Sequence, residues 1–222
     1  GPENKRMRIG LVLDSITGQA TDAATRETVE ATARVLEGLG HSVELIKLPI
    51  RESFADDFSQ YWGMLSYLLS TFGHKLLGAD FDKTQTDNLT QGLAQYYRKN
   101  MWRTPMMLWG MKRVANDYAE IFRNCDVLLS PVLSHTTPKL GHLSPVQSFE
   151  SLFERLRNYV SFTPLNNAAG TPALSMPMGR TAEGLPIAVQ LSGARGEERR
   201  LLALAFELEA AQPLHHLGLY TG

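Results

Sequence analysis

Three serines stand where a strand or loop could present a reacting hydroxyl. A serine attacks a carbonyl carbon only when a neighbouring base takes its proton. The motifs that fix such a pair by spacing, Gly-x-Ser-x-Gly and Ser-x-x-Lys, are both absent from the 222 residues. We therefore interpret Ser130, Ser161 and Ser175 as structural hydroxyls, with a nucleophilic role as the alternative.

Two carboxylates and one thiol are the other single groups that could react. Asp14 and Asp126 lie at the ends of apolar runs, where an α/β protein places catalytic groups and where backbone capping explains them equally well. Cys125 is the only cysteine and begins the apolar run Cys-Asp-Val-Leu-Leu. This position predicts a buried structural thiol in a reducing compartment.

Cofactor and metal motifs are missing from the sequence. No Gly-x4-Gly-Lys-Ser/Thr motif occurs, and Gly38-Leu39-Gly40 lacks the third glycine of a dinucleotide-binding loop. The six histidines are scattered, and the adjacent pair His215–His216 belongs to no His-Glu-x-x-His pattern. We expect no cofactor and no metal ion.

Composition restricts the class of protein and its partners. A hydrophobic fraction of 43% can fill a core, and a net charge of −1 gives no basic field for nucleic acid. No apolar run reaches the ~18 residues of a membrane span, and no signal-peptide pattern begins the chain. We expect a cytoplasmic globular protein that binds neither nucleic acid nor a membrane.

Residues 1–6 resemble a tag remnant or lead-in, and residues 7–222 are expected to form a single α/β domain.

The order of apolar runs and amphipathic segments predicts an α/β fold with a mixed, partly parallel sheet covered by helices. The first helix begins after an N-cap at Thr21 or Asp22, and its right-handed crossover makes the first two strands parallel neighbours. Strands are expected at residues 8–14, 41–48, 125–133 and 185–192, and helices at residues 21–40, 149–160 and 197–211.

The middle of the chain, residues 54–122, is rich in aromatic residues and methionine. Its spacing favours helices, with breaks near Gly73, over residues 78–87 and at Thr104-Pro105. The large side chains either form a helical core or line an apolar ligand pocket, and both can hold in part.

The segment over residues 163–179, Thr-Pro-Leu-Asn-Asn-Ala-Ala-Gly-Thr-Pro-Ala-Leu-Ser-Met-Pro-Met-Gly, places a backbone without offering an obvious reacting group. Asn166 and Asn167 favour a turn held by bonds from side chain to backbone, and Gly170 permits a backbone that a β-carbon would block. Pro172 then leads into a strand expected to end at Met176.

Taken with the apolar runs before it, this segment resembles the C-terminal part of amidase signature enzymes. The resemblance covers essentially the whole chain and is most specific over residues 162–211, whereas the middle segment is where that family varies most. The matching positions are Asn166 or Asn167, Gly170, Pro172-Ala173, Pro177, Gly184-Leu185-Pro186 and Val189-Gln190.

The resemblance implies a serine hydrolase mechanism in which a lysine and a bridging serine activate a nucleophilic serine. In that family these groups and the oxyanion loop lie in the N-terminal part, and no counterpart is found here. We therefore expect the C-terminal portion of an amidase, inactive alone, with the missing N-terminal part and a small-molecule amide as partners and self-association left open. The residues expected to form the wall of the substrate pocket are Trp62, Ser130, Pro131, Asn166, Asn167, Gly170 and Thr171, with a core role equally open for Trp62.

A free-standing α/β module that binds a ligand or another protein, with the aromatic middle as its binding face, is the alternative to the amidase. It explains the missing nucleophile without a second segment. An upstream reading frame with the lysine and a serine-rich loop favours the amidase, and a start codon near Met7 favours the module.

Overall fold

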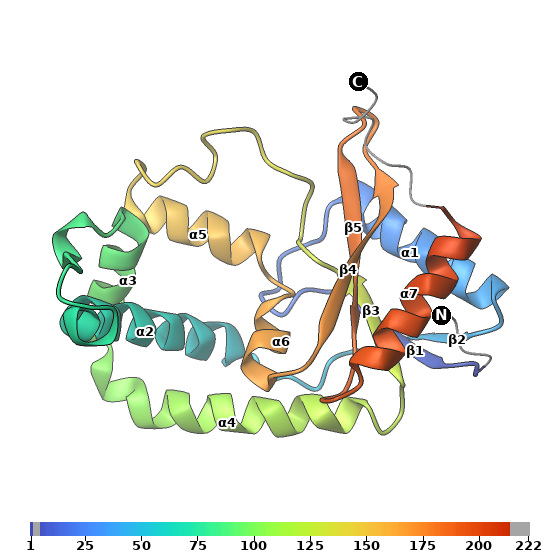
Figure 1. Ribbon diagram of the computed structural model, residues 1–222, viewed down its shortest axis with the longest axis horizontal. Helices are drawn as coiled ribbons and strands as arrows, with labels where there is room; N and C mark the ends of the chain where they lie inside the picture. Colours follow the sequence, from blue (N-terminus) through green and yellow to red (C-terminus); the bar gives the residue numbers. More distant parts are fainter. Residues whose placement is uncertain (2–4, 214–222) are drawn as a thin grey trace.

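A mixed sheet of five strands runs through the protein in the order β2-β1-β3-β5-β4 (Figure 1). The computed structural model describes residue 1 and residues 5–213. Strand β3 is parallel to β1 and antiparallel to β5, so the sheet changes direction at its centre. The predicted mixed, partly parallel α/β fold is confirmed. The strands are β1 (Arg8–Leu11), β2 (Ser42–Leu45), β3 (Val127–Pro131), β4 (Ala173–Arg180) and β5 (Pro186–Ser192).

The first unit of the chain is the predicted β–α–β crossover. Helix α1 (Ala23–Gly38) joins β1 to its parallel neighbour β2, with Ile9 opposite Val43. Asp22 is the N-cap, because one of its side-chain oxygens accepts a hydrogen bond from the Thr25 N–H at 2.8 Å. Its other oxygen accepts from the Thr136 N–H at 2.8 Å, which ties the start of α1 to the loop after β3.

Helices cover both faces of the sheet. On one face α1 and α7 (Glu198–Ala211) pack against alternate residues of the strands, including Ile9, Leu129 and Leu191. On the other face α4 (Thr104–Ile121) and α6 (Pro164–Ala169) pack around Leu128, with Tyr118 among the largest buried side chains. Because side chains alternate along each strand, the strands contribute residues to two separate cores, one on each face of the sheet.

The aromatic middle forms a helical lobe beside the sheet (Figure 1). Helices α2 (Phe54–Leu76) and α3 (Asn88–Lys99) pack on each other, and α4 returns from the lobe to the sheet. The break expected at Gly73 is wrong. Helix α2 passes through Gly73 and continues to Leu76. The glycine leaves room for Phe81, because a β-carbon there would lie 2.2 Å from its ring. Short 3-10 turns at Lys83–Gln85 and Met101–Arg103 lead into α3 and α4.

The C-terminal part returns to the sheet through α5 (Phe149–Tyr159), α6, and the hairpin of β4 and β5. The strand expected to end at Met176 instead runs to Arg180. Pro177 is compatible with it because β4 is an edge strand, and the register shifts between Pro177 and Gly179. Of the helices described, none has the length and hydrophobicity that crossing a membrane requires.

Replacing Asp22 by alanine tests the cap. Burial alone would raise the pKa of this carboxyl, but hydrogen bonds from Thr25 and Thr136 outweigh it and lower the pKa below 3.8. We expect Asp22→Ala to reduce the free energy of unfolding by about 1–2 kcal/mol at pH 7. Because the folded pKa is lowered, the difference is present above pH 3.8 and is lost as the pH falls through the folded value.

Denaturant unfolding between pH 7 and pH 3 measures this difference. Asp80→Ala, at an exposed carboxylate, is the matched control and should leave stability within about 0.5 kcal/mol of the parent. Equal losses from the two variants would contradict the role given to Asp22.

Candidate functional site

Asn166 and Asn167, which the sequence could not tell apart, have different environments. The expected turn is replaced by the short helix α6, which puts the two side chains on different sides. Asn166 is 8% exposed and points into the core beside the sheet. Asn167 is exposed, and its amide donates to the Thr163 carbonyl at 3.3 Å. Asn166 is therefore the residue that organises this part of the structure.

The Asn166 amide lies at the centre of a group of polar side chains, which we call the polar cluster. Its Oδ1 accepts from Gln190 Nε2 at 3.0 Å and from Ser192 Oγ at 3.4 Å. Its Nδ2 donates to Thr171 Oγ1 at 3.2 Å and to the Tyr118 hydroxyl at 3.4 Å. These four contacts use both ends of the amide, so a buried polar group is satisfied. The polar cluster is Tyr118, Asn166, Thr171, Gln190 and Ser192.

No member of the polar cluster is placed to act as a base. Burial raises the pKa of Tyr118 to about 12, although hydrogen bonds with Ser192 and Asn166 act in the opposite direction. Its hydroxyl is therefore protonated at neutral pH. Amides and hydroxyls at these positions can orient a backbone, but they supply no proton acceptor for a nucleophile.

Ser130 lies next to the polar cluster at the end of β3. The register pairs it with Gln190, and Gln190 is in turn paired with Ser175 of β4, so three polar residues follow one another across β3, β5 and β4. The Ser130 hydroxyl donates to the Pro131 carbonyl at 2.9 Å. Both Ser130 and Pro131 are buried. The geometry supports the structural interpretation of Ser130.

Ser161 is also held in a structural arrangement. Its hydroxyl lies 2.6 Å from the hydroxyl of Ser134, and both residues are fully buried. Ser134 also contacts the carbonyls of Asn158 and Tyr159. The pair fastens the loop after β3 to the end of α5, so this hydroxyl is used in packing.

Gly170 ends α6 in the left-handed conformation, with φ of 64°. Its N–H donates to the Asn166 carbonyl at 2.9 Å, and the Thr171 N–H donates to the same carbonyl at 3.2 Å. A β-carbon on Gly170 would lie 2.8 Å from Arg195 Nη2. The left-handed backbone and this close approach agree with the expectation that a β-carbon is disfavoured here, and the bend brings Thr171 back to Asn166.

Trp62 is separate from the other candidate residues. It lies on α2, in ring contact with Phe153 of α5 at 6.3 Å between centroids. It lines a narrow apolar pocket instead of contacting the polar cluster. The seven candidates therefore lie in three places. The pocket contains Trp62, Asn167 points outward, and the polar cluster or its immediate surroundings contain Ser130, Pro131, Asn166, Gly170 and Thr171.

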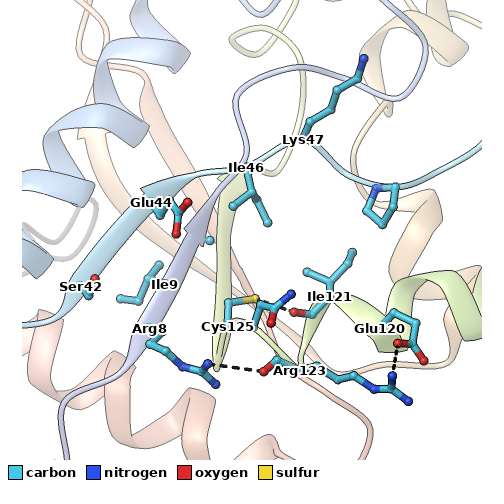
Figure 2. A pocket seen from close by; sticks show the side chains of 13 residues that line it. Arg8, Ile9, Ser42, Glu44, Ile46, Lys47, Glu120, Ile121, Arg123 and Cys125 are labelled. Carbon is cyan, nitrogen blue, oxygen red and sulfur yellow. Dashed lines mark hydrogen bonds and ion pairs between the residues drawn. The ribbon is translucent and has the colours of Figure 1, made fainter.

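A larger open pocket, of about 580 Å³, lies beside β1 and the end of α4 (Figure 2). Arg8 reaches the Arg123 carbonyl there, and Arg123 is paired with Glu120. Burial and the charge of Asp126 raise the pKa of Cys125 to about 11, and its thiol contacts the Ile121 carbonyl. The thiol is protonated at neutral pH, so Cys125 is not a thiolate nucleophile in this pocket.

Asp126 caps a strand and has no catalytic partner. It accepts from the Arg8 N–H at 2.9 Å and pairs with the Arg8 guanidinium. Burial alone would raise the pKa of Asp126, but these interactions with Arg8 outweigh it and lower the pKa. In the part of the chain that the structure describes, no three His, Cys, Asp or Glu residues are arranged to hold a metal ion. His215 and His216 lie outside the described residues.

Comparison with known proteins identifies the family. The amidase family model matches residues 1–202. This chain belongs to the amidase family. The resemblance to amidase signature enzymes, expected over essentially the whole chain, is thereby confirmed.

Relatives of this amidase-family chain are longer than the chain itself. AmiC of Mycobacterium leprae, a protein named as an amidase, is 38% identical over 213 residues, which are 96% of this chain and 45% of AmiC. A glutamyl-tRNA(Gln) amidotransferase chain of Bdellovibrio bacteriovorus is 28% identical over 93% of this chain and 46% of its own length. The chain thus spans about half the length of the curated relatives it matches.

Solved structures share the fold of this amidase-family chain. The structure of 6-aminohexanoate cyclic dimer hydrolase complexed with substrate superposes with a TM-score of 0.79 at 22% identity, over 96% of this chain and 46% of that one. A bacterial aryl acylamidase of the amidase signature family gives 0.70 at 18% identity, over 95% and 44% of the two chains. These likenesses concern the fold alone.

The sequence patterns indicated only some of the residues of the polar cluster. Asn166, Thr171, Gln190 and Ser192 lie in the segment that carries the family resemblance, whereas Tyr118 lies outside it and has no local signal. Tyr118 comes from α4, and only the tertiary fold brings its hydroxyl to Asn166.

The two asparagines provide a matched test of the polar cluster. Asn166→Ala removes the acceptor that Gln190 Nε2 and Ser192 Oγ share, so we expect the free energy of unfolding to fall by about 1–3 kcal/mol. Asn167→Ala removes an exposed side chain and should cost less than about 0.5 kcal/mol. Urea unfolding compares them, and the reverse order would contradict the assignment.

Thiol labelling tests the burial of Cys125. With its pKa raised to about 11, the native thiol should react with a disulfide reagent at pH 8 about a hundredfold more slowly than the unfolded chain in guanidinium. Equal rates in the two states would show that the thiol is accessible and ionised.

Proposed function

We propose that this chain is the C-terminal portion of an amidase, which hydrolyses the C–N bond of a small carboxylic amide. The nucleophilic serine, the bridging serine and the lysine are supplied by a further segment of the same enzyme. The observation that carries the proposal is the match to the amidase family over residues 1–202 in a chain that spans 45% of AmiC.

The environments of the candidate nucleophiles support a second segment. Ser130 bonds to a backbone carbonyl, Ser161 pairs with Ser134, and Cys125 is protonated. Among residue 1 and residues 5–213, none of these three groups forms a hydrogen bond with a lysine or a histidine side chain. Within the described part of the chain these groups therefore lack the base that an acyl-enzyme requires, and we infer that the chain alone is inactive.

The role proposed for this portion is to hold the substrate against the nucleophile. Hydrolysis of an amide requires the carbonyl to be held about 3 Å from the attacking oxygen and from the donors that stabilise the oxyanion. Ser130, Pro131 and the α6–β4 connection, with Gly170 and Thr171 fixed by Asn166, form one rigid wall of that site. Trp62 contributes to a second, apolar wall.

An uncovered part of the sheet is the surface proposed to meet the other segment. On β4 the side chains of Met176 and Met178 enter the core beneath α7, whereas Ala173, Ser175 and Pro177 point to the opposite face and are exposed. Ser175 continues the row from Ser130 and Gln190. The polar row thus runs out of the core to a surface on which a second segment can pack.

Expression of the whole reading frame tests the proposal. We expect the enzyme encoded by the frame that contains this chain to release amine from simple amides, and the 222-residue chain alone to release none above background. Replacing the nucleophilic serine of the added segment by alanine should abolish the activity. Hydrolysis by the isolated chain, or a frame that begins near Met7 and gives a protein without amidase activity, would contradict the proposal.

A further inference from the structure

Another open pocket lies between the loop after β3 and the hairpin of β4 and β5. Strand β3 leaves the sheet after Pro131, which is opposite Val189, and the pocket occupies the space beyond that pair. Its volume is about 420 Å³, and pockets that bind small molecules have roughly 300–1,000 Å³. We call it the hairpin pocket. The residues that line it include Val132, His135, Ser175 and Ile187.

The hairpin pocket continues the wall proposed for the substrate. Val132 follows Pro131 directly, and Ser175 is the residue of the polar row that reaches the surface on β4. The pocket is also at the carboxyl end of β3, whose parallel neighbour β1 has β2 on its other side. In open α/β sheets, ligands bind outside the carboxyl ends of parallel strands at such a position.

The contact of His135 with the backbone fixes which of its nitrogens carries a proton. Its Nδ1 lies 2.8 Å from the Thr136 carbonyl oxygen. Because a carbonyl oxygen only accepts, Nδ1 is the donor, and in the neutral ring Nε2 is then an acceptor. Among residue 1 and residues 5–213, no group forms a hydrogen bond with Nε2. His135 therefore gives the hairpin pocket an acceptor that the fold itself does not use.

The loop that carries His135 is fixed on both sides of this residue. The Ser134 N–H donates to the Tyr159 carbonyl at 3.0 Å, and the Ser134 carbonyl accepts from the Asp22 N–H at 2.9 Å. The Thr136 N–H donates to the Asp22 carboxylate at 2.8 Å. The His135 ring lies against the Tyr159 ring, with 4.6 Å between centroids. An acceptor held in this way is in place before a ligand arrives, which reduces the entropy lost on binding.

The lining of the hairpin pocket favours an uncharged ligand group. Among the described residues that line it, none is Asp, Glu, Lys or Arg. The polar side chains are threonines, Ser175 and His135, and the others are apolar, such as Val132 and Ile187. An ionised group would lose water there without gaining an opposite charge, which is unfavourable. An apolar group that carries one hydrogen-bond donor matches both the apolar side chains and His135 Nε2.

We propose that the hairpin pocket binds the part of the amide substrate that lies beyond the reacting carbonyl, and that His135 Nε2 accepts a hydrogen bond from a hydroxyl or N–H on that part. This inference rests on the proposed function and adds a substrate class to it. The preferred amides carry an uncharged, largely apolar group with a hydrogen-bond donor. His135 is a specificity residue, and the proton transfers of hydrolysis stay with the lysine and serines of the other segment.

Aryl amides that differ only in a ring substituent test the inference on the enzyme encoded by the whole reading frame. One set consists of benzamides and the other of acetanilides, each with a hydroxyl or a methoxy group at the meta or para position. The two substituents have similar electronic effects on the amide, but only the hydroxyl donates a hydrogen bond. We expect kcat/KM to be about three- to tenfold higher for the hydroxyl compound in one set, which is the value of one net hydrogen bond.

Variants connect this preference to His135. His135→Phe keeps a ring beside Tyr159 but removes the acceptor, so the ratio of hydroxyl to methoxy kcat/KM should fall about three- to tenfold. His135→Gln supplies a carbonyl acceptor in place of Nε2 and should retain part of the ratio. His74→Ala, at an exposed histidine of α2, is the matched control and should keep the parent ratio. A purely structural loss would lower kcat/KM for both compounds and leave the ratio unchanged.

Each outcome decides the inference. A preference for the hydroxyl compound that His135→Phe removes and His135→Gln partly retains supports it. Hydrolysis without such a preference in either set overturns the inference while the proposed function stands. A preference that His135→Phe leaves unchanged, or that His74→Ala also removes, overturns it in the same way. The absence of hydrolysis with these and all simple amides overturns both.

Discussion

The buried amide of Asn166 is the interaction on which the arrangement of this chain depends. It joins α6 to β5 through Gln190 and Ser192, and to α4 through Tyr118. These elements are far apart in the sequence, and each brings a polar group into an apolar core. Burying a polar group lowers the stability of the fold unless its hydrogen bonds are formed. The amide therefore fixes one relative position of helix, strand and loop. Gly170 then bends the chain so that Thr171 completes the same set of bonds.

The centre of the sheet sets where that polar group can lie. Strand β3 has a parallel neighbour on one side and an antiparallel neighbour on the other, and its last residues carry Ser130 and Pro131. Side chains of β3 and β5 alternate between the two cores. As a result Leu129 and Leu191 meet α1 and α7, while Ser130, Gln190 and Ser192 face α6. The same alternation that separates two apolar cores gathers the polar residues on one face.

Much of the fold was predictable from local signals. The β–α–β unit, the N-cap at Asp22, the final helix and the left-handed Gly170 each follow from a few neighbouring residues, whose preferences the tertiary structure keeps. The errors occurred where packing decided the outcome against a local preference. Gly73 predicts a helix break, yet α2 passes through it, and the ring of Phe81 occupies the space that a β-carbon would need. The asparagine pair reads as a turn, and only the positions of Tyr118 and Gln190 show which of the two is buried in a helix. The sequence analysis predicted Trp62 as a pocket residue. It could not predict the pocket itself, because segments from three parts of the chain form it.

The placement of the helical lobe between β2 and β3 has a consequence for how such a protein can diverge. The two sheet cores draw on the first turns of α2 and on the second half of α4, but not on α3 or on the residues between. Strand register and the Asn166 bonds therefore make no direct demand on the segment between those two anchors. A lineage that retains this scaffold can vary that stretch, provided that the contacts of α3 with α5 are kept.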